Sequence, residues 1–224
     1  MKFCFVLCSF ALSMLVATSV RADIMIDDFA LGATLLQFGA GSTVQTTSDP
    51  SIYGGSRNET LTVRDLSNEF LGVMGYGGSL SITQGAQDQI YGSLAYTGAP
   101  ANDLTQGGFN DRFAINVIGG SSSTPLTDVF SITATEGGNS QEVFFTIPGN
   151  GNLAQTVYAD FSAFTTIDFT QVDSVVLSFD FENASGNNVT IGSFFATIPE
   201  PAGLATIVSA SGLLMLRRRR PGRV

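Results

Sequence analysis

Short runs in which apolar and polar residues alternate constrain the fold of this chain more than any other feature. In the clearest run, Val175, Leu177, Phe179 and Phe181 share one side, and Ser178 lies among the polar residues of the other side. A period of two residues is typical of β-strands that turn one face to a core and the other to water. Comparable runs occur at 61–66, 80–82, 90–96, 112–117, 130–135, 143–147 and 189–195.

Glycine-rich segments separate these runs. They lie at 54–55, 77–78, 107–108, 119–120, 137–139, 149–151 and 186–188, and their residues tolerate the positive φ angles of tight turns. No sustained helical period occurs between residues 23 and 196. We therefore predict an all-β fold, a single antiparallel β-sandwich of roughly nine strands with jelly-roll-like connections, over residues 23–196. A parallel β-helix is the minor alternative, because the chain lacks a short strict repeat.

The first 22 residues have the composition of a signal peptide. Lys2 provides a small positive region, residues 3–16 are mostly apolar, and small residues precede a cleavage point between Ala22 and Asp23. The sequence therefore predicts an N-terminal signal helix at 1–22, which signal peptidase removes during export. Cys4 and Cys8, the two cysteines of the chain, lie inside this segment.

The C-terminal segment 197–224 has three parts in a fixed order. An extended Pro199, Glu200 and Pro201 precede mostly apolar residues at 202–216, and an arginine cluster follows, made of Arg217, Arg218, Arg219 and Arg220. Fifteen helical residues span about 22 Å, so a transmembrane helix here relies on the arginines to reach the polar interface. The arginines also hold that end in the cytoplasm as a stop signal. A buried core helix and a simple, unprocessed anchor are the alternatives.

The ordered tripeptide, apolar segment and arginine cluster resemble the PEP-CTERM sorting signal of exported bacterial proteins. The resemblance implies that an exosortase-type processing enzyme recognises the chain and cuts near Pro199, Glu200 and Pro201. It also implies a route in which the protein is anchored briefly in the inner membrane. The protein then reaches the cell surface or the extracellular space.

The predicted mature chain has no cysteine, histidine or tryptophan. A zinc site of His and Cys, a Ser-His-Asp triad and a Cys-His dyad are therefore excluded. Residues 23–199 hold eighteen acidic residues against Arg57, Arg64 and Arg112, a formal charge of −15, which argues against nucleic acid as a partner. We expect each of these arginines to have an acidic partner. The acidic excess either attracts divalent cations or keeps an exported domain soluble.

Two stretches near the ends of the predicted domain carry a second resemblance. Residues 26–29, with Asp27 and Asp28 at their centre, open the domain, and the runs 173–179 and 189–194 close it. These ends resemble those of galactose-binding-like jelly-roll sandwiches, which include many carbohydrate-binding modules. The resemblance implies that the first and last strands lie near each other. Many such modules carry an acidic residue or asparagine in the final strand, where this chain has Gly192 and Ser193.

Few side chains are candidates for a metal or catalytic site. Asp27 and Asp28 offer oxygen ligands to a structural calcium, the one cofactor considered, with Glu136 or Asn139 as a further donor. The alternative is a solvated strand start. Asp180 and Glu182 are same-face neighbours on one predicted strand, so about 7 Å separates them, a distance within the broad range between the two carboxyl groups of glycosidases. The alternative is that they are simply the polar side of the strand.

Four tyrosines allow either of two interpretations. Tyr53, Tyr76, Tyr91 and Tyr96 form a sugar-stacking surface, or they belong to the core and the sheet faces. Three hypotheses for the whole chain follow. The first is an exported, noncatalytic cell-surface or extracellular-matrix protein. The alternatives are a carbohydrate-binding module for extracellular polysaccharide and a hydrolase that uses carboxylates alone.

Overall fold

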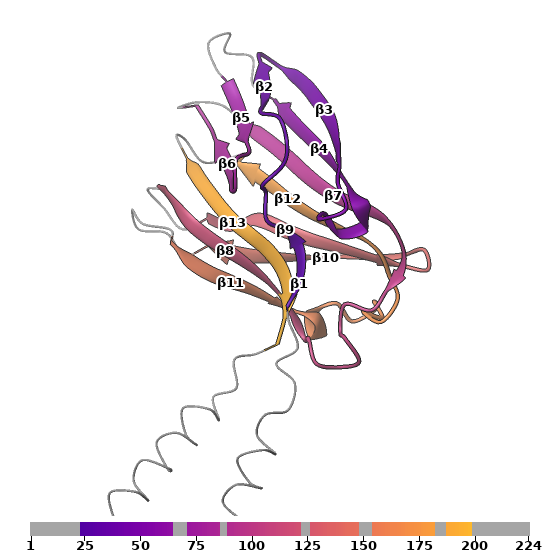
Figure 1. The fold of residues 1–224 in the computed structure, drawn as a ribbon. Helices are drawn as coiled ribbons and strands as arrows, with labels where there is room; N and C mark the ends of the chain where they lie inside the picture. Colours follow the sequence, from indigo (N-terminus) through magenta and orange to yellow (C-terminus); the bar gives the residue numbers. More distant parts are fainter. Residues whose placement is uncertain are drawn as a thin grey trace, which may run out of the picture.

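Two antiparallel β-sheets pack face to face in the computed structural model of this chain (Figure 1). The structure describes residues 23–64, 71–85, 89–121, 126–147, 154–181 and 187–198. Thirteen strands are assigned in these ranges, and every pairing between them is antiparallel. The predicted all-β sandwich is therefore confirmed.

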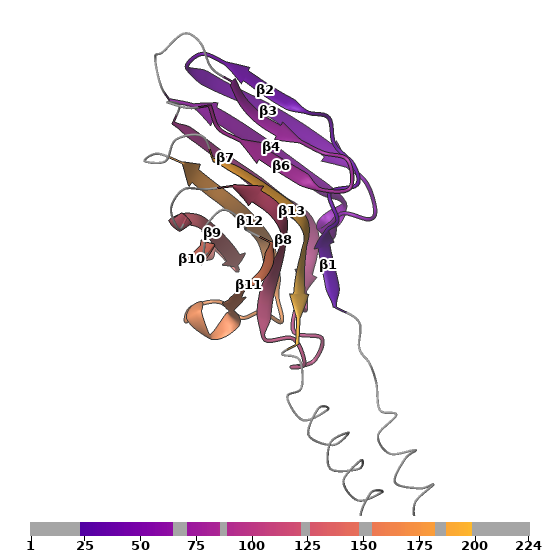
Figure 2. The ribbon, with the colours of Figure 1, turned by 90° about the vertical axis from the view of Figure 1, so that its left-hand side faces the viewer.

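The first sheet has seven strands. Its order is β11 (Gln155–Asp160), β8 (Arg112–Ser121), β13 (Asn188–Thr197), β6 (Leu80–Thr83), β5 (Leu71–Gly75) and β2 (Leu35–Phe38), with β1 (Ile24–Asp27) beside β13. Figures 1 and 2 show β1 next to β13, so the N-terminal strand closes against the last strand. The pairing of β1 with β13 confirms the expectation that the first and last strands lie near each other.

The second sheet has six strands. Its order is β10 (Asn139–Ile147), β9 (Leu126–Glu136), β12 (Val172–Phe181), β7 (Ile90–Asn102), β4 (Ser56–Val63) and β3 (Gly41–Ser48). From β7 onward the chain crosses between the two sheets at most of its connections. The exception is the β9–β10 hairpin, whose two-residue loop has positive φ at Gly137 and Gly138, as a type I′ turn requires.

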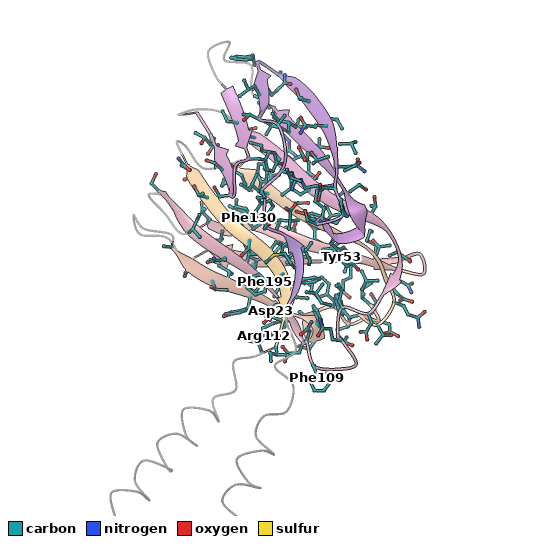
Figure 3. All side chains as sticks on the ribbon, in the orientation of Figure 1. Asp23, Tyr53, Phe109, Arg112, Phe130 and Phe195 are labelled. Carbon is teal, nitrogen blue, oxygen red and sulfur yellow. The ribbon has the colours of Figure 1, made fainter. Side chains whose placement is uncertain are left out.

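Phenylalanine rings fill much of the space between the sheets (Figure 3). Phe113 of β8 has its ring centroid 5.5 Å from that of Phe194 and 5.6 Å from that of Phe169. Phe130 of β9 packs in the same way against the rings of Phe179 and Phe181 from β12. These ring contacts link neighbouring strands within each sheet, and the rings of Tyr96 (β7) and Phe194 (β13), with centroids 6.0 Å apart, connect the two sheets.

The strong alternating runs all become strands, and several weaker segments were missed. Strands β2, β3, β5 and β11 were not predicted, because short or peripheral strands with two partly solvated faces give little hydrophobic alternation. The predicted turn at Gly119 and Gly120 is wrong, since both residues lie within β8. Gly120 has a φ of 137°, and a Cβ there would lie 2.3 Å from the backbone oxygen of Asn188. The backbones of β8 and β13 approach each other closely at this position, beside a register shift, so the strand requires glycine there.

Helical structure is scarce in the described part of the chain. It is limited there to the 3-10 turns η1 (Tyr53–Gly55) and η2 (Phe161–Ala163). No helix within the described ranges is long and apolar enough to cross a membrane. The predicted signal helix at 1–22 and the predicted transmembrane segment at 202–216 lie outside the described residues.

A packing contact at Gly92 gives a test of the fold. Gly92 of β7 pairs directly with Phe179 of β12, and an added Cβ would lie 2.1 Å from Cζ of the Phe179 ring. We expect Gly92→Ala to lower the free energy of unfolding by about 1–3 kcal/mol, because the ring must move within a filled core. Urea unfolding followed by circular dichroism measures this loss.

Gly119→Ala is the matched control. An added Cβ at Gly119 meets no atom within 4 Å, so this variant should be as stable as the natural chain or slightly more stable. Equal losses in the two variants would contradict the packing of the Phe179 ring over Gly92.

Candidate functional site

The most concentrated group of polar side chains lies between the two sheets, around the buried Arg57. Arg57 extends from β4, and its guanidinium contacts Asp27 Oδ2 through Nη1, Glu59 Oε1 through Nε at 2.8 Å and the carbonyl oxygen of Leu31 through Nη2 at 2.6 Å. All three charged side chains are at most 2 % exposed. The guanidinium carbon lies 4.3 Å from the ring centroid of Tyr76. The group joins β1 of one sheet to β4 of the other.

The Arg57 side chain stays charged within this group because of its acidic neighbour Asp27. Burial acts to lower the pKa of Arg57, but the charge of Asp27, aided by Tyr76 and Tyr96, raises it overall. Burial raises the pKa of Tyr76, and the nearby carboxylate of Glu59 raises it further. The pKa of Tyr96 is also raised, first by its complete burial and then by Asp27. Both tyrosines therefore stay neutral beside the ion pairs.

Among the predicted calcium ligands, Asp27 belongs to this group and Asp28 is its exposed neighbour, whereas Glu136 and Asn139 flank the β9–β10 turn. Asp27 Oδ1 accepts a hydrogen bond from the backbone N–H of Phe29 at 2.7 Å, and its other oxygen contacts Arg57. Asp28 is exposed and accepts a bond from the N–H of Ala30 at 3.0 Å. Within the described ranges, no three acidic side chains are grouped so as to hold a metal ion. These contacts give Asp27 a structural role, and calcium at Asp27 and Asp28 stays a prediction.

The expectation that each arginine has an acidic partner is confirmed. Besides Arg57, Arg64 Nη1 lies 3.2 Å from Asp180 Oδ2, and both side chains are more than a third exposed. Arg112 Nε lies 2.9 Å from Asp111 Oδ1 and 3.4 Å from Asp160 Oδ1. Asp180 therefore has a basic partner, which favours its ionised form. Its proposed catalytic companion, Glu182, lies outside the described residues.

The four tyrosines do not form an exposed stacking surface. Tyr96 is fully buried, Tyr53 is 9 % exposed and Tyr76 packs on Arg57, so these three belong to the interior. Tyr91 alone lies on an outer face, where its ring is 5.3 Å from the guanidinium carbon of Arg64. The structure thus supports the core interpretation for three of the four.

The outer face of the six-stranded sheet carries three rows of side chains in which serine and threonine predominate, here called the hydroxyl face. Direct cross-strand pairs form a row across all six strands, made of Val44, Thr60, Ser93, Ser178, Ser131 and Phe144. The two ends of the row are large and exposed, at 67 % for Val44 and 54 % for Phe144. Of the four residues between them, Thr60 and Ser93 are partly exposed, whereas Ser131 and Ser178 are buried.

Two further rows extend the hydroxyl face. One row runs through Thr46, Asn58, Ala95, Val176, Thr133 and Glu142, and the other through Thr97, Ser174, Thr135 and Ser140. Hydrogen bonds order several of these side chains, for example Thr46 Oγ1 to Asn58 Oδ1 at 2.7 Å and Ser131 Oγ to Glu142 Oε1 at 2.6 Å. Within these three rows, Glu142 is the single ionisable side chain.

Sequence reasoning missed the hydroxyl face as a site. The polar sides of the runs at 130–135 and 174–180 were visible as hydroxyl-rich, but β3 was not predicted and the order of the strands was unknown. A recurring Ser or Thr at every second position of several strands was the available signal.

A pocket of about 430 Å³ lies at one end of the sandwich, lined by Thr105, Asn110, Asp111, Arg112, Asp160, Phe161, Ser162, Ile167, Asp168 and Phe169. Figure 3 shows Arg112 at the same end as Asp23. Arg112 pairs with Asp111 and Asp160, and hydrogen bonds from Thr170 lower the pKa of Asp168. These hydrogen bonds favour the ionised form of Asp168.

The predicted processing residues lie almost wholly outside the described ranges. Ala22, Pro199, Glu200, Pro201 and the arginine cluster are not among the described residues. Asp23 is described, and its Oδ1 accepts a hydrogen bond from Thr197 Oγ1 at 2.6 Å. The predicted start of the mature chain and the end of β13 therefore lie side by side.

Comparisons with known proteins return structural similarities only. No family model matches the sequence, and no curated protein sequence matches it. The chain is similar in structure to the family 11 carbohydrate-binding module of the cellulase Lic26A-Cel5E of Clostridium thermocellum, with 17% identity, a TM-score of 0.40 and coverage of 82% of this chain and 99% of that one. It is also similar to the family 30 module of Cel9D-Cel44B of the same organism, with 15% identity, a TM-score of 0.42 and coverage of 80% and 99%.

A third similar structure is the Clostridium thermocellum family 11 module in complex with a β-1,3-1,4-mixed-linked tetrasaccharide. It has 16% identity and a TM-score of 0.40, and the match covers 81% of this chain and 99% of that chain. These neighbours are carbohydrate-binding modules. At these scores the similarity supplies no argument for a ligand or a binding residue in this chain.

The buried ion pairs around Arg57 predict a large effect on stability. Arg57→Met should lower the free energy of unfolding by about 3–5 kcal/mol, because Asp27 and Glu59 would remain buried without their cationic partner. Denaturant unfolding of the purified variant measures the loss.

Arg64→Met is the control. It removes an arginine from a partly exposed ion pair, and Arg64 directly follows β4, the strand that carries Arg57. Its cost should stay below about 1 kcal/mol. A loss for Arg57→Met no larger than that for Arg64→Met would refute the structural importance of the buried pairs.

Proposed function

We propose that this chain is an exported, noncatalytic cell-surface or extracellular-matrix protein whose hydroxyl face binds a neutral extracellular polysaccharide. The observation that carries the proposal is the row from Val44 to Phe144, which crosses six strands with serine and threonine in its middle. With strands about 4.8 Å apart, this row is roughly 24 Å long, which suits an extended chain of several sugars.

The chemistry of the face matches sugar hydroxyl groups. A partly exposed hydroxyl, such as that of Thr60, Ser93 or Thr133, supplies one donor and two acceptor positions, so these side chains can pair with ligands that are themselves rich in hydroxyls. The exposed Phe144 and the half-buried Tyr91 offer apolar surface for the faces of sugar rings. The strongly acidic domain repels acidic polysaccharides, which favours a neutral one.

The noncatalytic character rests on the state of the carboxylates. Asp27 and Glu59 are buried in ion pairs with Arg57, and Asp180 is paired with Arg64. In the end pocket, Asp111 and Asp160 share Arg112. The predicted mature chain also lacks histidine and cysteine, so carboxylates would have to act alone. We infer that neither the pocket nor the hydroxyl face performs hydrolysis.

The two terminal signals supply the delivery route of this proposal. The signal peptide at 1–22 directs export, and the segment 197–224 holds the chain in the inner membrane until an exosortase-type enzyme processes it. Asp23 and Thr197 lie together, so both processing steps act at one end of the sandwich. The hydroxyl face is then free of the membrane after release.

Polysaccharide binding is tested by placing a charge in the middle of the hydroxyl face. Ser93 of β7 is partly exposed between Thr60 and Ser178, so Ser93→Glu should fold normally and block the row. We expect the natural protein to be retained on at least one neutral polysaccharide. The variant should lose at least tenfold in affinity, about 1.4 kcal/mol, in affinity electrophoresis or a glycan array.

Thr190→Glu is the matched control. Thr190 lies on the central β13 strand of the other sheet and is exposed to a similar degree, so its variant carries the same added charge on the opposite face. Binding should be unchanged in this control. Equal loss in both variants, or no retained polysaccharide at all, would refute the proposed binding face.

The delivery route is tested separately at the sorting motif. Replacing Pro199, Glu200 and Pro201 by alanine should leave the full tail attached and the protein in the inner membrane, because the processing enzyme loses its recognition element. Cell fractionation and intact-mass measurement report the mature species. The same mature mass in the natural and altered chains would show that this motif does not direct processing.

A further inference from the structure

Strand β3 is a long and regular edge of the six-stranded sheet. Its eight residues pair continuously with β4, from Gly41 opposite Val63 to Ser48 opposite Ser56, without a bulge. On its other side, no strand is hydrogen-bonded to it in the described structure. Figures 1 and 2 both show β3 on the outer border of the fold. An edge of this kind presents unpaired N–H and C=O groups that can pair with a further strand.

The other outer strands carry features that hinder such pairing. Strand β10 bears Glu142 on its outer face and has a register shift between Phe145 and Ile147. Strand β11 has six residues and ends in Asp160, while β1 and β2 have four residues each. Shortness, charge and bulges are the usual means by which edges are protected. Strand β3 has none of them.

The segment around β3 is also unusual in charge. Residues 29–48 contain no charged residue and no proline, the longest charge-free stretch of the chain. Val44 at the centre of β3 is 67 % exposed, and Phe38 of the adjoining β2 is 72 % exposed. A second copy of this acidic protein could therefore approach here without bringing carboxylates together.

We propose that β3 pairs antiparallel with β3 of a second copy, which joins two six-stranded sheets into one sheet of twelve strands. A two-fold axis through the middle of β3 relates the copies, so the contact is closed and self-complementary. Ser42, Val44 and Thr46 of both copies then lie on one face, because residues opposite each other in an antiparallel pair share a face.

A second copy is the occupant that these features favour. An identical uncharged strand supplies the same Ser, Thr and Val side chains and lets polar residues face polar residues across the axis. The net charge of the rest of the domain opposes contacts elsewhere, so association is confined to this edge. The pairing also makes the hydroxyl faces of both copies continuous. It does not depend on polysaccharide binding.

The test places a positive charge at the proposed axis. The full 224-residue chain, in a mild detergent that accommodates its terminal apolar segments, should form dimers in sedimentation equilibrium. Val44→Lys should raise the apparent dissociation constant by about tenfold or more, because two lysines would then meet across the axis. Circular dichroism should be unchanged, since Val44 is largely exposed.

Phe144→Lys is the matched control on the opposite edge of the same sheet, where a large exposed side chain occupies the equivalent end of the row. Its dimer should be as strong as that of the natural chain. Loss of association in this variant but not in Val44→Lys would overturn the proposal by moving the contact to β10. A monomer at all concentrations would also overturn it and would point to a different occupant.

A cross-link gives a readout that does not depend on affinity. In a chain with Cys4→Ser and Cys8→Ser, Val44→Cys should yield a dimer with a short bis-maleimide, because the two cysteines lie close to the axis. Cysteine at the partly exposed Thr190 position, on the other sheet, should stay monomeric under the same conditions. Equal cross-linking from both positions would show nonspecific contact and would refute the pairing of β3.

Discussion

The ion pairs of Arg57 tie the two sheets of this protein together. Arg57 reaches from β4 of one sheet to Asp27 at the end of β1 in the other, and its Nε donates to Glu59 of its own strand. The guanidinium also covers the ring of Tyr76 and contacts the backbone at Leu31. Taking these charges out of water is costly unless every partner is in place, so the cluster fixes one arrangement of the N-terminal segment. Few alternative packings could satisfy it.

Several other features depend on this anchored N-terminal segment. With Asp27 held, β1 pairs with β13, and Asp23 lies against Thr197. Both ends of the sandwich domain therefore leave from one place. Gly32 is needed on the way from β1 to β2, because an added Cβ would lie 2.7 Å from both Arg57 Nη2 and the Tyr76 ring. The chain then continues to β2 and β3 at the border of the fold.

Outside the Arg57 cluster, the charged residues are mostly acidic, because the sandwich domain has only two other arginines. Arg64 and Arg112 are paired, and the hydroxyl face consists mostly of serine and threonine. Hydroxyl side chains on such a face offer both donors and acceptors, which is the chemistry on which the proposed polysaccharide binding relies. The proposed pairing of β3 would double the length of this face, and two binding faces on one particle bind a repetitive polymer more tightly than one.

The sequence by itself determined the elements that depend on neighbouring residues. Period-two alternation located the strong strands such as β9 and β12, and the glycines at 137 and 138 located a hairpin turn, because both signals arise within a few residues. The scarcity of basic residues also indicated that each arginine would be paired. Charge balance is a property of composition and needs no knowledge of the fold.

Only the tertiary structure decided which distant residues meet. Asp27, which pairs with Arg57, lies 30 residues from it in the sequence. The row from Val44 to Phe144 depends on the order of six strands, which no local pattern encodes. Gly119 and Gly120 looked like a turn, yet their place beside β13 makes them part of a strand. Peripheral strands such as β3 are polar on both faces, so alternation could not reveal them. Strand order is set by packing of the whole core, because a strand's own sequence specifies its face but not its neighbour.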